Sequence, residues 1–159
     1  MNYNPSTQSR IADINLGIRV DKAAIAIAGI STKDIFTVVG GRVLVRALIG
    51  EVTVAIQAQA NAAKFRSTPT VGAVADMCAT GETNNMAVGG MISLPGTSIA
   101  TAAHVTSTTA VGAVPACNTA GIIVPAGTIG FNTAADNTGS MKFTLWYVPL
   151  DDGAYVVAA

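Results

Sequence analysis

The side chains best suited to acid–base chemistry are few in this sequence and lie far apart. His104 is the only histidine, in the stretch TAAHVTS, and no neighbour in the sequence stands out as an orienting partner or an activated nucleophile. Asp151 and Asp152 are adjacent, so on a strand they would point to opposite faces, and Gly153 after them favours a turn. We interpret His104 as a surface or core histidine and the two aspartates as turn-capping residues. The sequence therefore predicts no catalytic residue. An enzyme that depends on His104 or Asp151 ranks third among three functional hypotheses, after two non-catalytic ones.

Metal and cofactor motifs are equally scarce. Cys78 and Cys117 match no metal or redox spacing, and one histidine with two distant cysteines cannot supply a structural zinc site. Calcium bound by Asp136, Asn137 and nearby carbonyls is an alternative that lacks the EF-hand pattern. The pair Gly40–Gly41 is followed by a strand-like stretch and not by a helix, so it does not form a phosphate-binding loop. We predict no metal site and no cofactor.

Three aromatic residues in one stretch form the remaining candidate binding site. Phe143, Trp146 and Tyr147 could stack on a sugar ring, but at this spacing aromatic side chains more often belong to a core or a subunit interface. The sequence therefore predicts no binding-site residue either.

The most strongly patterned part of the chain is Ile35–Gln57, IFTVVGGRVLVRALIGEVTVAIQ. Apolar residues alternate at Val43, Val45, Ala47 and Ile49, and again at Val52, Val54 and Ile56, which is the period of β-strands. Gly40–Gly41 is typical of a two-residue hairpin turn, and Gly50 would allow a bend or a bulge. The pattern predicts a meander of three strands, with its middle strand covered on both faces.

Further short strands are predicted on both sides of this stretch. The expected ranges are 14–21, 24–30, 64–68 (closed by Pro69), 91–94, 122–124, 128–132, 141–148 and 155–157. Turn residues separate them, and no helix of ordinary length is expected. Residues 13–159 should form a single all-β domain, a sandwich or a barrel with spacing that suits a jelly roll. The polar residues 1–12 should form an extended arm.

Charge is scarce and unevenly distributed. Only 11% of the residues are charged, against roughly 25% in ordinary soluble domains, while 50% are hydrophobic. This predicts that much of the surface contacts partner subunits, the alternative being a surface rich in Ser, Thr and Asn.

The charges are unevenly distributed along the chain. Residues 1–66 carry eight basic and four acidic side chains, a balance of +4, and residues 67–159 carry one basic and five acidic side chains, a balance of −4. Pairing between opposite halves of two protomers is one expectation, and scattered solvated charges are the other.

Several classes of partner are not expected. No cluster of basic residues is dense enough to bind nucleic acid. The longest apolar run is about eight residues, Ala23–Ile30, far below the roughly 20 that a membrane-spanning helix needs. The N-terminal stretch MNYNPSTQSR has no apolar signal core, which predicts synthesis in the cytoplasm and reduced thiols, although two cysteines would allow one disulfide.

Two stretches resemble small structural proteins of tailed bacteriophages. The first is IFTVVGGRVLVRALIGEVTVAIQAQANAAKFRSTPT, and the second is IIVPAGTIGFNTAADNTGSMKFTLWYVPLDDGAYVVAA. The resemblance implies a β-rich virion protein, and a capsid decoration (cement) protein is the leading hypothesis. It further implies a homo-oligomer, expected to be a trimer, that binds the major capsid protein on the capsid surface after assembly in the host cytoplasm. Deleting residues 1–12 should then weaken capsid binding and leave the fold intact.

A different hypothesis is a trimeric receptor-binding or glycan-binding module of a phage fibre or spike. It would use the loops Thr83–Gly90 and Ser107–Gly121 and the side chain of Trp146. Copy number separates the two hypotheses, because a decoration protein is abundant on each particle and a receptor binder is scarce.

Overall fold

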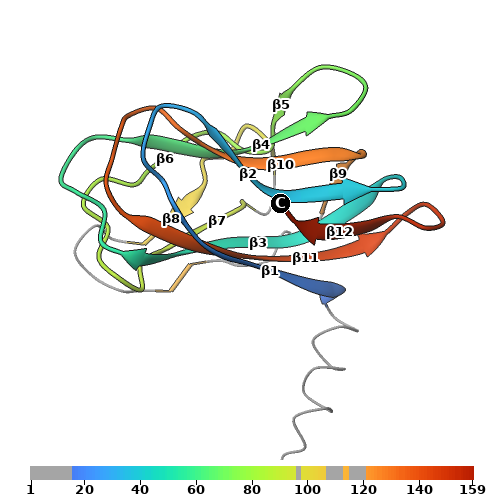
Figure 1. Cartoon of the computed structure of the whole chain (residues 1–159), viewed down its shortest axis with the longest axis horizontal. Helices are drawn as coiled ribbons and strands as arrows, with labels where there is room; N and C mark the ends of the chain where they lie inside the picture. Colours follow the sequence, from blue (N-terminus) through green and yellow to red (C-terminus); the bar gives the residue numbers. More distant parts are fainter. Residues whose placement is uncertain (1–15, 96–97, 107–112, 115–120) are drawn as a thin grey trace, which may run out of the picture.

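The protein is an antiparallel β-sandwich. The computed structural model describes residues 16–95, 98–106, 113–114 and 121–159, and all the elements within them are strands. Two six-stranded sheets pack against each other, as Figure 1 shows. The predicted all-β sandwich is confirmed, and the sheets do not close into a barrel. The predicted arm, residues 1–12, lies outside the described residues.

The two sheets are called sheet A and sheet B. Sheet A has the order β1 (Ile18–Ala26), β11 (Ser140–Pro149), β3 (Val43–Val54), β7 (Met91–Ser93) and β8 (His104–Val105), with β9 (Ile122–Val124) pairing to the start of β3. Sheet B has the order β12 (Tyr155–Ala158), β2 (Thr32–Val39), β10 (Gly127–Thr133), β4 (Ala62–Pro69) and β5 (Ala75–Asp76), with β6 (Gly81–Glu82) also pairing to β4.

The first four long strands alternate between the two sheets along the chain. β1, β3 and β11 belong to sheet A, whereas β2, β4 and β10 belong to sheet B. The first long strand pairs with the last, β1 with β11, and β2 pairs with β10. This nesting of early strands against late ones is the order of a double-sheet jelly roll. All of these pairings are antiparallel and long-range, so neighbouring strands lie far apart in sequence.

The predicted meander over Ile35–Gln57 is wrong. β2 pairs with β10 and β12 in sheet B, whereas β3 pairs with β11, β7 and β9 in sheet A, so Gly40–Gly41 connects the sheets and is not a hairpin turn. Glycine is required there by close packing against the turn between β11 and β12. A Cβ atom on Gly40 would lie 2.4 Å from the carbonyl oxygen of Gly153, and one on Gly41 would lie 2.7 Å from Cβ of Asp151.

Gly50 does not interrupt β3 either. The register between β3 and β11 shifts at two other places, next to Arg46 and next to Thr53. The shift at Arg46 reverses the expected alternation, so that Leu48 is fully buried and Ile49 is only half-buried. The outer face of β3 is partly exposed, which corrects the expectation that both faces are covered.

Parts of the two strands expected at 14–21 and 24–30 belong to one strand, β1, whereas residues 27–30 are not in a strand. A register shift between Lys22 and Ile25 interrupts its pairing with β11 without ending the strand. The pieces predicted at 64–68, 91–94, 122–124, 128–132, 141–148 and 155–157 correspond to β4, β7, β9, β10, β11 and β12 and are confirmed.

The core lies between the sheets and is centred on three phenylalanines. Phe65 and Phe131 come from sheet B, and Phe143 comes from sheet A. The ring of Phe131 has its centre 5.6 Å from that of Phe65 and 5.3 Å from that of Phe143, with tilted planes, and all three side chains are buried. Within the described residues, no helix is long and apolar enough to span a membrane.

Candidate interaction surfaces

The structure does not bring the candidate acid–base residues together. His104 lies on β8 at one edge of sheet A, opposite Ser93 of β7, and is half-buried. Asp151 follows β11, which is separated from β8 by two strands of the same sheet. The two groups therefore occupy different parts of the sandwich.

Asp151 has a structural role in the turn between β11 and β12. Its Oδ2 accepts hydrogen bonds from the backbone N–H of Arg42, at 2.7 Å, and from Nε of the same residue, at 3.0 Å, while its Oδ1 accepts one from Nη2 at 2.7 Å. These bonds from Arg42 lower the pKa of Asp151 to about 2. The carboxylate thereby links the connection between β2 and β3 to the turn that precedes β12.

The acidic and amide groups proposed for calcium are engaged in loop contacts. Asp136 accepts a hydrogen bond from the backbone N–H of Gly29 at 2.6 Å, and the amide nitrogen of Asn137 donates to the carbonyl of Gln59 at 3.4 Å. Across the part of the chain that the structure describes, no three His, Cys, Asp or Glu side chains gather to hold a metal ion.

One of the two cysteines is described. Cys78 is buried, has no disulfide partner among the described residues, and its Sγ accepts a hydrogen bond from the backbone N–H of Phe65 at 3.4 Å. Burial raises the pKa of this thiol, so it remains protonated and poorly reactive. Cys117 lies outside the described residues.

The three clustered aromatic residues divide between the core and the surface. Phe143 and Tyr147 point into the core, and Trp146 lies half-buried on the outer face of sheet A. The guanidinium carbon of Arg19 lies over the indole, 5.7 Å from the ring centre, and both Nε and Nη2 of Arg19 donate to Asp21. The exposed face of the indole thus already carries a cation, which a stacking sugar would have to displace.

A charged groove of about 530 Å³ lies on the same outer face of sheet A. Its charged lining residues come from three strands and are Arg19, Asp21, Lys22, Glu51 and Lys142. Lys142 pairs with Glu51 at 3.0 Å, and Thr144 donates a hydrogen bond to Asp21 at 2.8 Å. Both signs of charge alternate across the groove, which suits a polar partner surface better than a single ion. Sequence reasoning missed this groove because its residues become neighbours only through the pairing of β1, β11 and β3.

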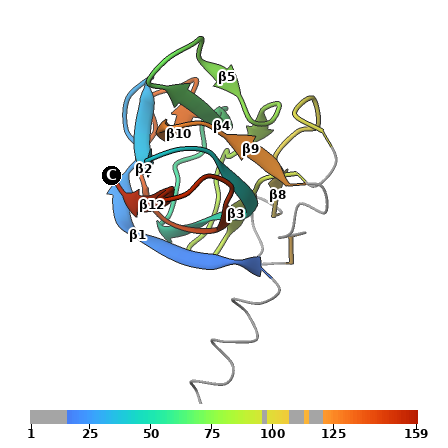
Figure 2. The same cartoon turned by 90° about the vertical axis from the view of Figure 1, so that its right-hand side faces the viewer.

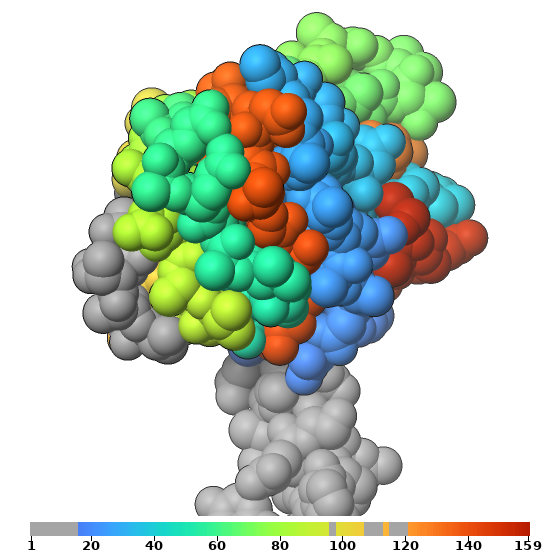
Figure 3. All heavy atoms as spheres, turned by 60° about the vertical axis from the view of Figure 1, so that its left-hand side comes forward, coloured from blue at the N-terminus to red at the C-terminus, as the bar shows by residue number. Residues whose placement is uncertain are grey.

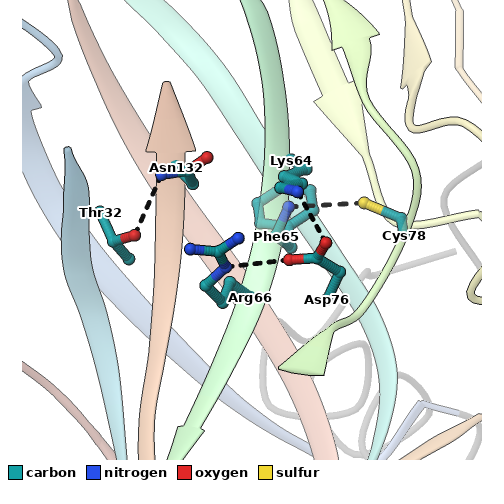
Figure 4. A network of polar contacts seen from close by, with 7 residues as sticks. All are labelled: Thr32, Lys64, Phe65, Arg66, Asp76, Cys78 and Asn132. Atoms are coloured by element: carbon teal, nitrogen blue, oxygen red, sulfur yellow. Dashed lines mark hydrogen bonds and ion pairs between the residues drawn. The ribbon is translucent and has the colours of Figure 1, made fainter. Parts of the chain in front are cut away.

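The outer face of sheet B carries a second polar network, shown in Figure 4. Asp76 on β5 pairs with Lys64 at 2.6 Å and with Arg66 at 2.9 Å, both on β4. The hydrogen bond from Lys64 is the main reason that the pKa of Asp76 lies below its usual range. Together with the Arg42–Asp151 pair, this network joins the basic first part of the sequence to the acidic second part within one chain. These pairs therefore do not require a second protomer.

An apolar groove of about 250 Å³ lies at the end of the sandwich where β4 ends and β9 begins. It is lined by Pro69, Ala73, Ala75, Met77, Ile99, Ile122, Ile123, Val124 and Pro125, with Ser67 and Asp76. Two large apolar side chains that line it remain exposed, Ile99 and Ile123 by 60% each, and Val74, next in sequence to the lining residues Ala73 and Ala75, is 52% exposed. Exposed apolar side chains gathered in this way are typical of a protein–protein contact.

The opposite end of the sandwich is polar and tightly bonded. Asn61 accepts hydrogen bonds from the backbone N–H groups of Ala134 and Ala135, at 3.1 and 3.0 Å, and its own N–H donates to Glu82 at 2.6 Å. Figure 3 shows the loops that meet at this end, with residues 55–61 in teal beside residues 134–138 in orange.

The two loops considered for receptor binding differ in what the structure describes. Thr83 and Met86 are fully buried within the Thr83–Gly90 loop, whereas Val88 is 57% exposed. Thr83 is anchored through its hydroxyl to the carbonyl of Asn61 at 3.0 Å. Most of Ser107–Gly121 lies outside the described residues.

No protein-family model matches the chain, and no curated protein or solved structure is significantly similar to it.

Proposed function

We propose that this chain is a structural protein of a tailed bacteriophage that decorates and stabilises the capsid. The phage assignment comes from the resemblance of the Ile35–Thr70 and Ile122–Ala159 stretches to such proteins. In this role the chain forms a homo-oligomer, expected to be a trimer, binds the major capsid protein at the capsid surface, and is assembled in the host cytoplasm. It contacts neither nucleic acid nor a membrane and performs no catalysis.

The observation that carries the proposal is the exposed apolar groove. A hydrophobic core already lies between the sheets, so the exposed groove residues Ile99 and Ile123 are not needed for it. Covering such side chains with a partner removes apolar surface from water, at roughly 25 cal/mol per Å². A protein bound at this groove would strengthen a shell by mass action, because disassembly must also break the added contacts.

The jelly-roll order supports the proposal by analogy alone. Double-sheet jelly rolls recur in viral capsid proteins and also in lectins, so the fold is compatible with decoration and with glycan binding. Surface residues, and not the fold, must therefore distinguish a decoration protein from a glycan-binding protein.

The experiment measures binding to emptied heads of the phage that encodes the chain. Purified chain should bind them in hundreds of copies per particle by gel densitometry. The double variant Ile99→Asp/Ile123→Asp should lose occupancy, because both residues line the apolar groove and each is 60% exposed. Val88→Asp is the matched control, since Val88 is similarly exposed but does not line the groove. Equal occupancy of the double variant and the control would refute a capsid contact at this groove.

The second candidate is a trimeric receptor-binding or glycan-binding module of a fibre or spike. The charged groove favours it, because Arg19 both lines the groove and lies over the half-buried ring of Trp146, so a polar ligand could contact the ring and the charged side chains together. Such a protein would be scarce on the particle and would bind host cells. Trp146→Ala should then reduce cell binding without affecting binding to emptied heads.

A further inference from the structure

The outermost strand of sheet B, β12, has an edge without the usual protection against strand pairing. The other strands at the sheet edges are very short or charged: β5, β6 and β8 have two residues each, β9 has three, and β1 carries charged residues and a register shift. β12 consists of Tyr155, Val156, Val157 and Ala158, which include neither a charge nor a proline, and its register with β2 is regular.

The backbone of β12 offers hydrogen-bonding groups on its free side. Ala159 donates its N–H to the carbonyl of Ile35 at 3.1 Å, and hydrogen-bonded pairs alternate along an antiparallel ladder. Tyr155 and Val157 therefore bond to β2, whereas Val156 and Ala158 direct their N–H and C=O groups away from it. β1 lies on the same side of the sandwich (Figure 2), but β12 forms no ladder with it.

We propose that β12 pairs with β12 of a second copy of this chain, antiparallel about a twofold axis at Val157. Val156 then lies opposite the partner's Ala158, and both residues present free backbone groups, so the two symmetric pairs each exchange two hydrogen bonds. Val157, which is 43% exposed, meets the partner's Val157 on the outer face, where no hydrogen bonds hold the strands and side chains approach most closely. The contact makes one continuous sheet from the two B sheets.

Charge selects a second copy and the antiparallel direction. β12 begins after the turn that holds Asp152 and the Arg42–Asp151 ion pair, a net charge of −1, and it ends where Nζ of Lys22 contacts the carbonyl oxygen of Ala159. An antiparallel pair places the acidic end of each copy beside the Lys22 end of the other, within about one Debye length of 10 Å. A parallel pair would place like charges together. The uncharged strand itself adds no repulsion at the axis.

Cysteine cross-linking tests the register. In a Cys117→Ser background, Val157→Cys should form a disulfide-linked dimer under mild oxidation, because directly opposite residues of a non-hydrogen-bonded pair have Cα atoms about 4.5 Å apart, within the range for a disulfide. Tyr155→Cys is the matched control on the same exposed face. Its two copies would be offset by four residues along the strands, about 13 Å, which is beyond disulfide reach. Equal cross-linking of both variants, or none in a natively folded Val157→Cys, would overturn the proposal.

A second variant separates pairing from folding. Ala158→Pro removes only the N–H on the free edge, so the fold should persist, since proline is tolerated where an edge N–H faces outward. The dissociation constant of the dimer, measured by analytical ultracentrifugation, should rise about tenfold or more, because both copies lose a hydrogen bond. Ala158→Val retains the N–H and should leave dimerisation unchanged. A dimer, or a hexamer that combines twofold and threefold axes, supports the contact. A particle that stays monomeric or trimeric up to millimolar concentration overturns it and leaves the capsid proposal intact.

Discussion

Replacing Gly50 with alanine tests how tightly the side chains of sheet A pack around β3. Gly50 lies inside β3, and a Cβ atom there would lie 2.9 Å from Cε1 of Phe143, 3.0 Å from Cγ2 of Ile92 and 3.0 Å from Cε of Met141. Real Cβ atoms are hardly ever this close to a neighbour, and Phe143 and Ile92 are buried and cannot move aside. We therefore expect Gly50→Ala to destabilise the protein.

The magnitude follows from two opposing effects. Overpacking a well-filled core costs about 1–3 kcal/mol, whereas replacing glycine within a strand recovers about 0.5–1 kcal/mol of backbone entropy. The expected loss of unfolding free energy is about 1–2 kcal/mol. For a chain of this length that lowers the melting temperature by about 2–8 °C.

Urea denaturation followed by the fluorescence of Trp146, the single tryptophan, measures this loss. Met141→Ala provides an internal check, because it removes the flexible side chain nearest the new Cβ atom. Its cost should be smaller in the Gly50→Ala background than in the parent, with a coupling of about 0.5 kcal/mol or more. In a Gly153→Ala background the effects should simply add, because nothing lies within 4 Å of a Cβ atom at Gly153. A Gly50→Ala variant as stable as the parent would refute the packing argument.

Three further outcomes are expected. Phe131→Leu should lower the unfolding free energy in urea denaturation more than Phe65→Leu or Phe143→Leu does. Phe131 makes two ring contacts, each worth about 0.5–1.5 kcal/mol, and the other two phenylalanines make one each. Equal losses of unfolding free energy would contradict a central role for Phe131. Asp151→Asn should be less stable than the parent at neutral pH, and this difference in stability should vanish as the pH falls from about 4 to about 2. The reason is that the pKa of Asp151 is about 2 in the folded state and about 3.9 in the unfolded state. A difference in stability that persists at pH 2 would contradict this. The thiol of Cys78 should react with maleimide at pH 8 only after unfolding, since burial raises its pKa, and rapid labelling of native protein in a Cys117→Ser background would contradict this.

The local pattern was enough to predict the fold class and most strands, because each strand carries its own period of two. Met141, Phe143, Leu145 and Tyr147 alternate with exposed or half-buried residues in β11 as the sequence predicts. The glycine pairs and prolines marked chain breaks correctly, and Asp151 was correctly assigned to a turn. The interpretation of the three clustered aromatic residues as core or interface residues is confirmed for Phe143 and Tyr147, which are buried.

Neither the partner of each strand nor the site could be read from the chain. The same Gly-Gly pair can close a hairpin or carry the chain from one sheet to the other, and only packing against the β11–β12 turn decides between them. The register shift at Arg46 also depends on pairing with β11, and it reverses the faces of Leu48 and Ile49. The charged groove joins Asp21, Glu51 and Lys142, which long-range pairing brings side by side. Strand periodicity is a local property that neighbouring residues determine, whereas neighbours across a sandwich depend on contacts between distant segments, and those exist only once the two sheets have packed.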